Sequence, residues 1–347
     1  MTGLGILWFI IIAILLIGYF ALDGFDLGVG VLYPFVAKNQ RTKSMMIRAI
    51  GPVWDGNEVW LLTAGGALFA AFAPAYATCF SGFYLAIMLV LFGLILRAVA
   101  IEFAAERTAP AKFWDFTFFI GSLLPALLFG VAIGNVIAGI PLDAHGDYTG
   151  SFFGLLTPFA LCCGVLGLVH MLMQGSAWMA AKAPHNDLMH EKFARLRRVF
   201  AVIDLAVFAL VTVLYFVLVV PNSAVGLGTN GVAIFFAVVF VISTLITLLP
   251  NPKQWKYDFV VPIASGLGCA GLVGIFASSL FPYIVPSTIA ENSLTIANSA
   301  SSDVSLTAMT LIAIVGVILV LAYHVYVYRV FAGRLDEADF AGEHGAY

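Results

Sequence analysis

Residues 5–35 read GILWFIIIAILLIGYFALDGFDLGVGVLYPF, an apolar stretch interrupted by only two charged residues. A helix needs about 20 apolar residues to cross a bilayer, so this stretch is long enough to span one. The apolar character continues past residue 30, and no twin-arginine motif or small-residue cleavage site follows it. We therefore expect a retained first transmembrane helix rather than a signal peptide.

Comparable stretches recur along the whole chain. Of its 347 residues, 62% are hydrophobic and 10% are charged, whereas a soluble domain carries about 25% charged residues. We predict an all-α polytopic membrane protein with one integral domain, residues 1–334, and a short acidic cytoplasmic tail, residues 335–347. Nine transmembrane helices are expected, near residues 5–35, 51–72, 76–101, 115–139, 152–181, 199–220, 231–250, 257–281 and 304–328.

The positive residues lie on one side of this nine-helix path. All sixteen lysines and arginines fall in or beside alternate connections. The intervening connections, near 73–75, 140–151, 221–230 and 282–303, contain none. The positive-inside rule makes the positive side cytoplasmic. The N-terminus is then expected in the periplasm and the C-terminus in the cytoplasm.

Carboxylates in the first two predicted helices are the strongest indication of function. There are four of them, at Asp23, Asp26, Asp55 and Glu58. A carboxylate inside a membrane costs several kcal/mol unless it is paired, protonated or in contact with water. The i,i+3 spacing within each pair places both members on one helix face. This pattern indicates a wet or protonatable track, and we expect at least one acid to move a proton or an ion.

Helix capping and packing are the alternative explanation for the first acid pair. Gly24 and Gly28 form a small-xxx-small pair, which lets another helix approach closely. Part of this motif is therefore expected to serve packing.

Other polar residues inside the predicted helices carry weaker indications. His170 and His324 could each ligate haem iron or transfer a proton, or could be satisfied by a neighbouring backbone carbonyl. Arg97 and Glu102 are interpreted as interfacial anchors near the cytoplasmic end of the third helix. Asp204 could pair with the basic cluster that precedes it or extend a proton route. These residues alone fit either a stand-alone proton-coupled transporter or a subunit of a redox complex.

A family resemblance rests on the two acid motifs and their surroundings. Asp23–Gly30, Trp54–Leu61 and Thr63–Ala71 closely resemble subunit II of cytochrome bd ubiquinol oxidase. Shorter motifs, including Gly130–Asn135 and Phe281–Tyr283, fit the same family in the same order along the chain. One departure is visible at Ile296–Ser302, where some members carry a Trp-Asp pair.

The resemblance implies two four-helix bundles plus one peripheral helix. It also implies quinol:oxygen oxidoreduction in the bacterial inner membrane, with uptake of cytoplasmic protons for water formation. Subunit II would be a scaffold that binds no haem or other metal, contains no catalytic residue, and lines a proton route. The family's proton-path acids correspond most directly to Asp55 and then to the Asp23/Asp26 motif, while Glu58 is included from its position.

The resemblance further implies a heterodimer with subunit I. That partner would hold haem b558, haem b595 and haem d together with the quinol-oxidising loop. Some relatives add a small single-span subunit, and some hold a structural quinone in subunit II. The sequence places neither of these here. Membrane lipid and quinone are the other expected partners, and nothing in the sequence indicates a nucleic-acid partner.

Overall fold

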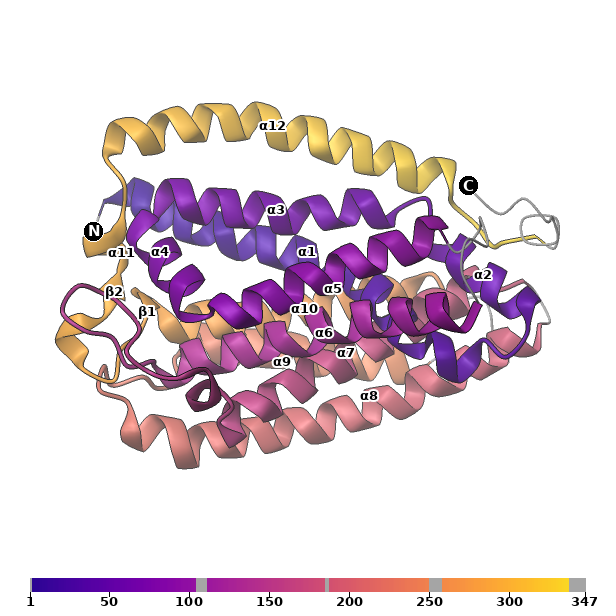
Figure 1. Ribbon diagram of the computed structural model, residues 1–347, viewed down its shortest axis with the longest axis horizontal. Coiled ribbons are helices and arrows are strands. Elements are labelled where there is room, and N and C mark those ends of the chain that lie inside the picture. The colour runs from indigo at the N-terminus through magenta and orange to yellow at the C-terminus, as the bar shows by residue number, and fades with distance from the viewer. Residues whose placement is uncertain (1, 104–110, 185–186, 250–257, 337–347) are drawn as a thin grey trace.

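The computed structural model describes residues 2–103, 111–184, 187–249 and 258–336 and is almost entirely helical (Figure 1). The helices in chain order are α1 (Gly3–Val36), α2 (Gln40–Ile50), α3 (Trp54–Ala71), α4 (Ala73–Gly82), α5 (Tyr84–Phe103), α6 (Ala111–Ala138), α7 (Pro158–Lys182), α8 (Leu188–Leu214), α9 (Gly231–Leu248), α10 (Val260–Leu280), α11 (Ile296–Ser299) and α12 (Asp303–Val330). Four shorter helical turns are η1 (Phe152–Leu155), η2 (Tyr215–Val219), η3 (Val220–Asn222) and η5 (Ala290–Asn292).

Eight helices within the described residues are long and apolar enough to cross a membrane. They are α1, α5, α6, α7, α8 with the short turns that follow it, α9, α10 and α12. The chain is therefore an all-α polytopic membrane protein, as predicted. The expected second span also forms a helix, α3, but Asp55, Asn57 and Glu58 near its start make it less apolar and it is not one of the eight.

The two ends of the bundle hold different elements. Figure 1 shows the start of α1 at one end with α4, α11 and the strands β1 and β2, and the end of α12 at the other end with α2. α3 runs along the bundle between α1 and α12. The predicted acidic tail lies outside the described residues from 337 onward.

α1 is the central helix and packs against α3, α6, α7 and α10. Its close contact with α7 depends on the glycines at positions 24 and 28, which have no Cβ atom. This is the role expected from the sequence for the Gly24/Gly28 pair. A Cβ atom at Gly28 would lie 1.8 Å from the carbonyl oxygen of Met171, and one at Gly24 would lie 2.5 Å from Oε1 of Gln174. The packing role of this pair is confirmed.

The segment between α10 and α12 folds over one end of the bundle. β1 (Tyr283–Val285) pairs with β2 (Leu294–Thr295) in an antiparallel arrangement. Ser301 donates its backbone N–H to the carbonyl of Ala71 at 2.8 Å, which ties the segment to the end of α3.

Three predicted spans differ from the helices observed. The 76–101 span is divided at Phe83 into α4 and α5, and the 152–181 span is η1 followed by α7. α7 begins at Pro158 because Thr157 caps it and proline fits the first helical position. α8 begins at Leu188, eleven residues before the predicted 199, because its first three turns are helical but charged and hydropathy does not detect them.

α12 is a peripheral helix with most of its side chains exposed. Near its start, Trp8 of α1 donates its indole N–H to the carbonyl of Leu306 at 3.2 Å and to Thr310 Oγ1 at 3.1 Å. Its remaining polar contacts reach α3 and are part of the site described next.

Candidate functional site

Arg97 of α5 lies at the centre of a buried charged cluster. Its side chain is 0% exposed, and its Nη2 atom is 2.7 Å from Oδ1 of Asp23 and 3.1 Å from Oε2 of Glu58. The prediction that Arg97 is an interfacial anchor is therefore wrong. Burying a guanidinium is tolerable only beside charged or hydrogen-bonding partners, and helices α1 and α3 each supply one carboxylate. Glu102, its predicted companion, is exposed.

Asp26 lies one helical turn beyond Asp23 and is also fully buried. Its Oδ2 atom accepts a hydrogen bond of 2.8 Å from Nδ2 of Asn57, and Nδ2 also lies 3.2 Å from the carbonyl of Leu22. The Asn57 Oδ1 atom accepts a 2.9 Å hydrogen bond from the hydroxyl of Tyr328. This chain of contacts joins α1, α3 and α12. The second Asp26 oxygen, Oδ1, has no hydrogen-bond partner among the described residues.

The α3 acid pair is divided between two environments. The Glu58 side chain is 24% exposed and reaches inward to Arg97. Asp55 is exposed on the surface of α3 and makes no recorded hydrogen bond or ion pair with a described residue. Residues three apart on a helix are rotated by about 60° from each other. The two acids lie at the edge of the buried face of α3. The rotation between them therefore turns Glu58 toward the cluster and leaves Asp55 on the surface.

The cluster brings three of the four predicted acids together. Among the described residues, Arg97 is the one cation in contact with Asp23 and Glu58, and Asp26 lies in the next turn with a neutral amide beside it. One positive charge thus faces three carboxyl groups in a low-dielectric interior. A buried group of this composition is suited to holding and exchanging protons, because full ionisation would leave uncompensated negative charge.

Known proteins resemble this chain over nearly its whole length. The family model for cytochrome bd terminal oxidase subunit II matches residues 4–331. The chain belongs to this family. It is 36% identical to the probable cytochrome oxidase subunit 2 of Haemophilus influenzae, over 95% of this chain and 94% of that one. It is 34% identical to the cytochrome bd-I ubiquinol oxidase subunit 2 of Escherichia coli K12, covering 96% and 95%.

More distant relatives agree. The cytochrome bd ubiquinol oxidase subunit 2 of Bacillus subtilis is 31% identical, over 98% of this chain and 99% of that one. The fold matches the bd oxidase of Geobacillus thermodenitrificans with a TM-score of 0.77 at 16% identity, covering 95% of this chain and 99% of that chain. The protein is thus a multi-pass component of the bacterial inner membrane, a subunit of a terminal oxidase complex, and has a subunit I as its partner.

The intramembrane histidines of this subunit II are both hydrogen-bonded within the chain. His324 accepts a hydrogen bond from the Trp60 indole N–H at its Nε2 atom, 3.1 Å away, and its Nδ1 atom lies 2.9 Å from the carbonyl of Val320. His170 has Nδ1 2.8 Å from Asp204 Oδ2. Its Nε2 atom lies 3.1 Å from a backbone carbonyl, that of Ser265. Each of the four ring nitrogens therefore has a polar partner within this chain. Among the described residues, no three His, Cys, Asp or Glu side chains are grouped to hold a metal.

Sequence reasoning missed two ionic contacts. The buried Asp204 pairs with His170 of the preceding helix rather than with the basic cluster at the start of its own helix. Near the opposite end of α8, His190 Nε2 lies 2.7 Å from Oδ2 of the buried Asp258, and Arg334 donates to the same oxygen. Two intramembrane ionisable groups on adjacent helices were the available signal for the first pair. The second contact joins His190, Asp258 and Arg334, which are far apart in the sequence, so no short sequence pattern indicates it.

Proposed function

We propose that this subunit II ligates no haem, holds the haem-bearing subunit I, and lines a cytoplasmic proton-uptake route for the reduction of oxygen to water by quinol. The observation that carries the proposal is the buried cluster of Asp23, Asp26 and Glu58 around Arg97. The proposal also draws on relatives over nearly the full chain, which are named as ubiquinol oxidase subunits.

The route begins at the end of the bundle that holds α2 and the last turn of α12. Asp55 lies in the first turn of α3 at this end, and Glu58 follows one turn deeper. The Glu58 carboxylate is partly exposed and touches Arg97, which in turn touches the buried Asp23. Protons would pass from the surface to Glu58 and on to the α1 acids, with Arg97 holding the carboxyl groups in place. Carboxylate chains of this kind form proton relays in other membrane proteins.

The exposed Asp55 favours one position for subunit I. A carboxylate facing lipid is costly, and Asp55 is exposed on a helix that runs along the bundle. We therefore place subunit I against this face of α3. In this arrangement Asp55 lies at the junction of the two subunits, where a proton can pass between them.

The topology we propose has nine crossings, with α3 as the ninth. α3 has 18 residues, which corresponds to about 27 Å at 1.5 Å per residue, close to the thickness of the hydrocarbon core. The start of α1 and the end of α12 lie at opposite ends of the bundle, which requires an odd number of passages between them. The helices α1, α3, α5 and α6 form one bundle and α7 to α10 the other, while α12 is peripheral. The lysines and arginines near α2 support a cytoplasmic location for that end under the positive-inside rule.

A spectrum of the purified complex tests this function. Membranes are solubilised and purified through a tag on this chain, and a reduced-minus-oxidised visible spectrum is recorded. Haem b and haem d signals with a co-eluting second large subunit are expected. A stable single chain without haem absorbance would instead support a stand-alone proton-coupled transporter, a function to which none of the relatives above lends support.

A further inference from the structure

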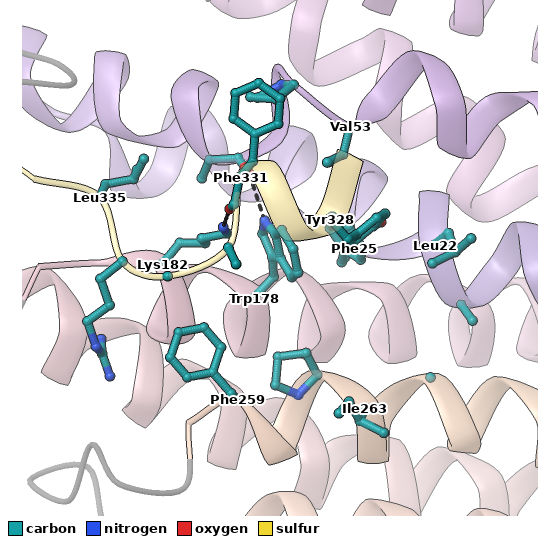
Figure 2. Close-up of a pocket in the computed structure, with 18 of the residues that line it drawn as sticks. Leu22, Phe25, Val53, Trp178, Lys182, Phe259, Ile263, Tyr328, Phe331 and Leu335 are labelled. Atoms are coloured by element: carbon teal, nitrogen blue, oxygen red, sulfur yellow. Dashed lines mark hydrogen bonds between the residues drawn. The ribbon is translucent and has the colours of Figure 1, made fainter. Parts of the chain in front are cut away.

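A cavity of about 790 Å³ lies between α1, α7, α10 and the end of α12. Figure 2 shows Leu22 and Phe25 of α1 and Ile263 of α10 around its apolar part, with Trp178 and Tyr328 beside them. The cavity continues from there to the last turn of α7 and the chain that follows α12. It is separate from the acid cluster, because neither Arg97 nor any of the four acids lines it.

One end of the cavity is positively charged. Its described lining residues include Arg48, Lys182 and Arg334 and contain no aspartate or glutamate. Arg334 is neutralised by its ion pair with Asp258. Lys182 donates to the carbonyl of Phe331, a contact drawn in Figure 2, and Arg48 has no recorded hydrogen bond or ion pair with a described residue. Arg48 and Lys182 thus line the cavity without a matching acid among the described residues.

The cavity is open on the side of α10. Phe259, Ile263 and Leu267 line it and are 47%, 67% and 52% exposed. Their spacing of four residues places them on one face of the helix. In a membrane protein such an apolar face contacts acyl chains, so a lipid chain can enter laterally. The row from Phe259 to Leu267 extends about 12 Å along the helix axis, at 1.5 Å per residue.

We propose that this cavity binds one anionic phospholipid, with its phosphate at Arg48 and Lys182 and an acyl chain in the apolar part along α10. Charge complementarity decides the occupant. A phosphate gains from two unmatched cations at the cytoplasmic membrane surface. A quinone head group is uncharged and gains nothing comparable from them. The site lies in the integral-membrane part of the chain and its occupancy does not depend on proton transfer through the acid cluster.

Native mass spectrometry of the tagged, detergent-washed complex tests the proposal. Phosphatidylglycerol and phosphatidylcholine with identical acyl chains are added, and the lipid that remains bound is counted. We expect one phosphatidylglycerol to be retained more tightly than phosphatidylcholine. Arg48→Gln should weaken phosphatidylglycerol binding about fivefold and weaken phosphatidylcholine binding less, because choline already compensates the charge of its phosphate. The matched control is Arg195→Gln, an exposed arginine on α8 outside the cavity, which should change neither.

A second variant tests the apolar part of the site. A Cβ atom at Gly266 would lie 3.5 Å from Cβ of Ala21, an ordinary contact, so Gly266→Leu fits the backbone and fills the cavity. It should displace both lipids from the tight site. Equal retention of the two lipids, equal effects of the Arg48 and Arg195 variants, retention of a quinone in place of phospholipid, or displacement by glycerol 3-phosphate alone would each overturn the proposal.

Discussion

Arg97 of α5 and Asp23 of α1 form an ion pair with 2.7 Å between Nη2 and Oδ1, and both side chains are fully buried. Glu58 of α3 touches the same nitrogen at 3.1 Å. Three helices from the first half of the chain are therefore connected through a single guanidinium group. Because removal of either partner leaves a charge in the apolar interior, this pair is expected to matter more for folding than any surface ion pair of the molecule.

The first prediction concerns this guanidinium. Arg97→Gln leaves Asp23 and Glu58 without their cation, and breaking a buried pair in this way costs about 3–5 kcal/mol. We expect a large decrease in the thermal unfolding temperature of the purified complex. Arg195→Gln breaks an exposed i,i+4 pair with Glu191 and should cost less than about 1 kcal/mol. Recovery of stability in the Arg97→Met, Asp23→Leu double variant would assign the loss to the unpaired charge; equal unfolding of Arg97→Gln and wild type would contradict the prediction.

The second prediction concerns Asp26. Asn is nearly the same shape as Asp, and its side-chain oxygen can still accept the hydrogen bond from Asn57, so Asp26→Asn should preserve stability and haem content. An amide cannot carry the proton, and quinol oxidase turnover should fall by about tenfold or more. The control is Glu191→Gln, an exposed acid on α8 outside the cluster. Wild-type turnover in Asp26→Asn would exclude Asp26 from the proton route.

The third prediction separates Asp55 from the buried acids. Asp55 is exposed and lies outside the Arg97 cluster, so Asp55→Asn should not change the unfolding temperature of the complex. If Asp55 passes protons at the subunit junction, quinol oxidase turnover should still decrease. Assembly with subunit I, measured by co-purification, and haem content serve as internal controls. Normal turnover with normal assembly would remove Asp55 from the pathway.

The burial of Asp23 and Asp26 and the role of the glycines could be predicted from sequence, and the Arg97 cluster could not. Charged residues in an apolar helix must find partners, so Asp23 and Asp26 were recognisable without a structure. An arginine close to the end of a hydrophobic stretch normally reaches the membrane interface, which is why Arg97 was misassigned. Helical periodicity gives the face on which a side chain lies but not the helix that it meets, and the Arg97 and His170 pairings are both contacts between helices.

The fourth prediction concerns the contact between α1 and α7. A Cβ atom at Gly28 would lie 1.8 Å from the backbone oxygen of Met171, so Gly28→Ala forces the two helices apart. Overpacking of this kind costs about 1–3 kcal/mol, and the unfolding temperature should fall. Gly167→Ala on α7 is the matched control, because its Cβ would lie 3.6 Å from the nearest atom, the Ala126 oxygen. Similar unfolding temperatures for the two variants would show that α1 and α7 do not need this close approach.

The last prediction connects α12 to the acid cluster. The Tyr328 hydroxyl donates to Oδ1 of Asn57, and the same Asn57 side chain donates to Asp26. Tyr328→Phe leaves a buried amide oxygen without a donor, which costs about 1–3 kcal/mol. Hydrogen exchange should become faster in the second half of α12. Turnover should fall less than in Asp26→Asn, because Asn57 loses one of the contacts that orient it while the acid itself remains.

Tyr326→Phe is the control for this variant, since Tyr326 lies on the same helix but is 66% exposed. It changes the same atoms without touching Asn57 and should leave hydrogen exchange and turnover at wild-type values. If both tyrosine variants accelerated exchange equally, the hydroxyl of Tyr328 would not be what holds α12 to α3. If Tyr328→Phe accelerated exchange but left turnover unchanged, α12 would be an attached helix with no part in positioning the proton-carrying acid.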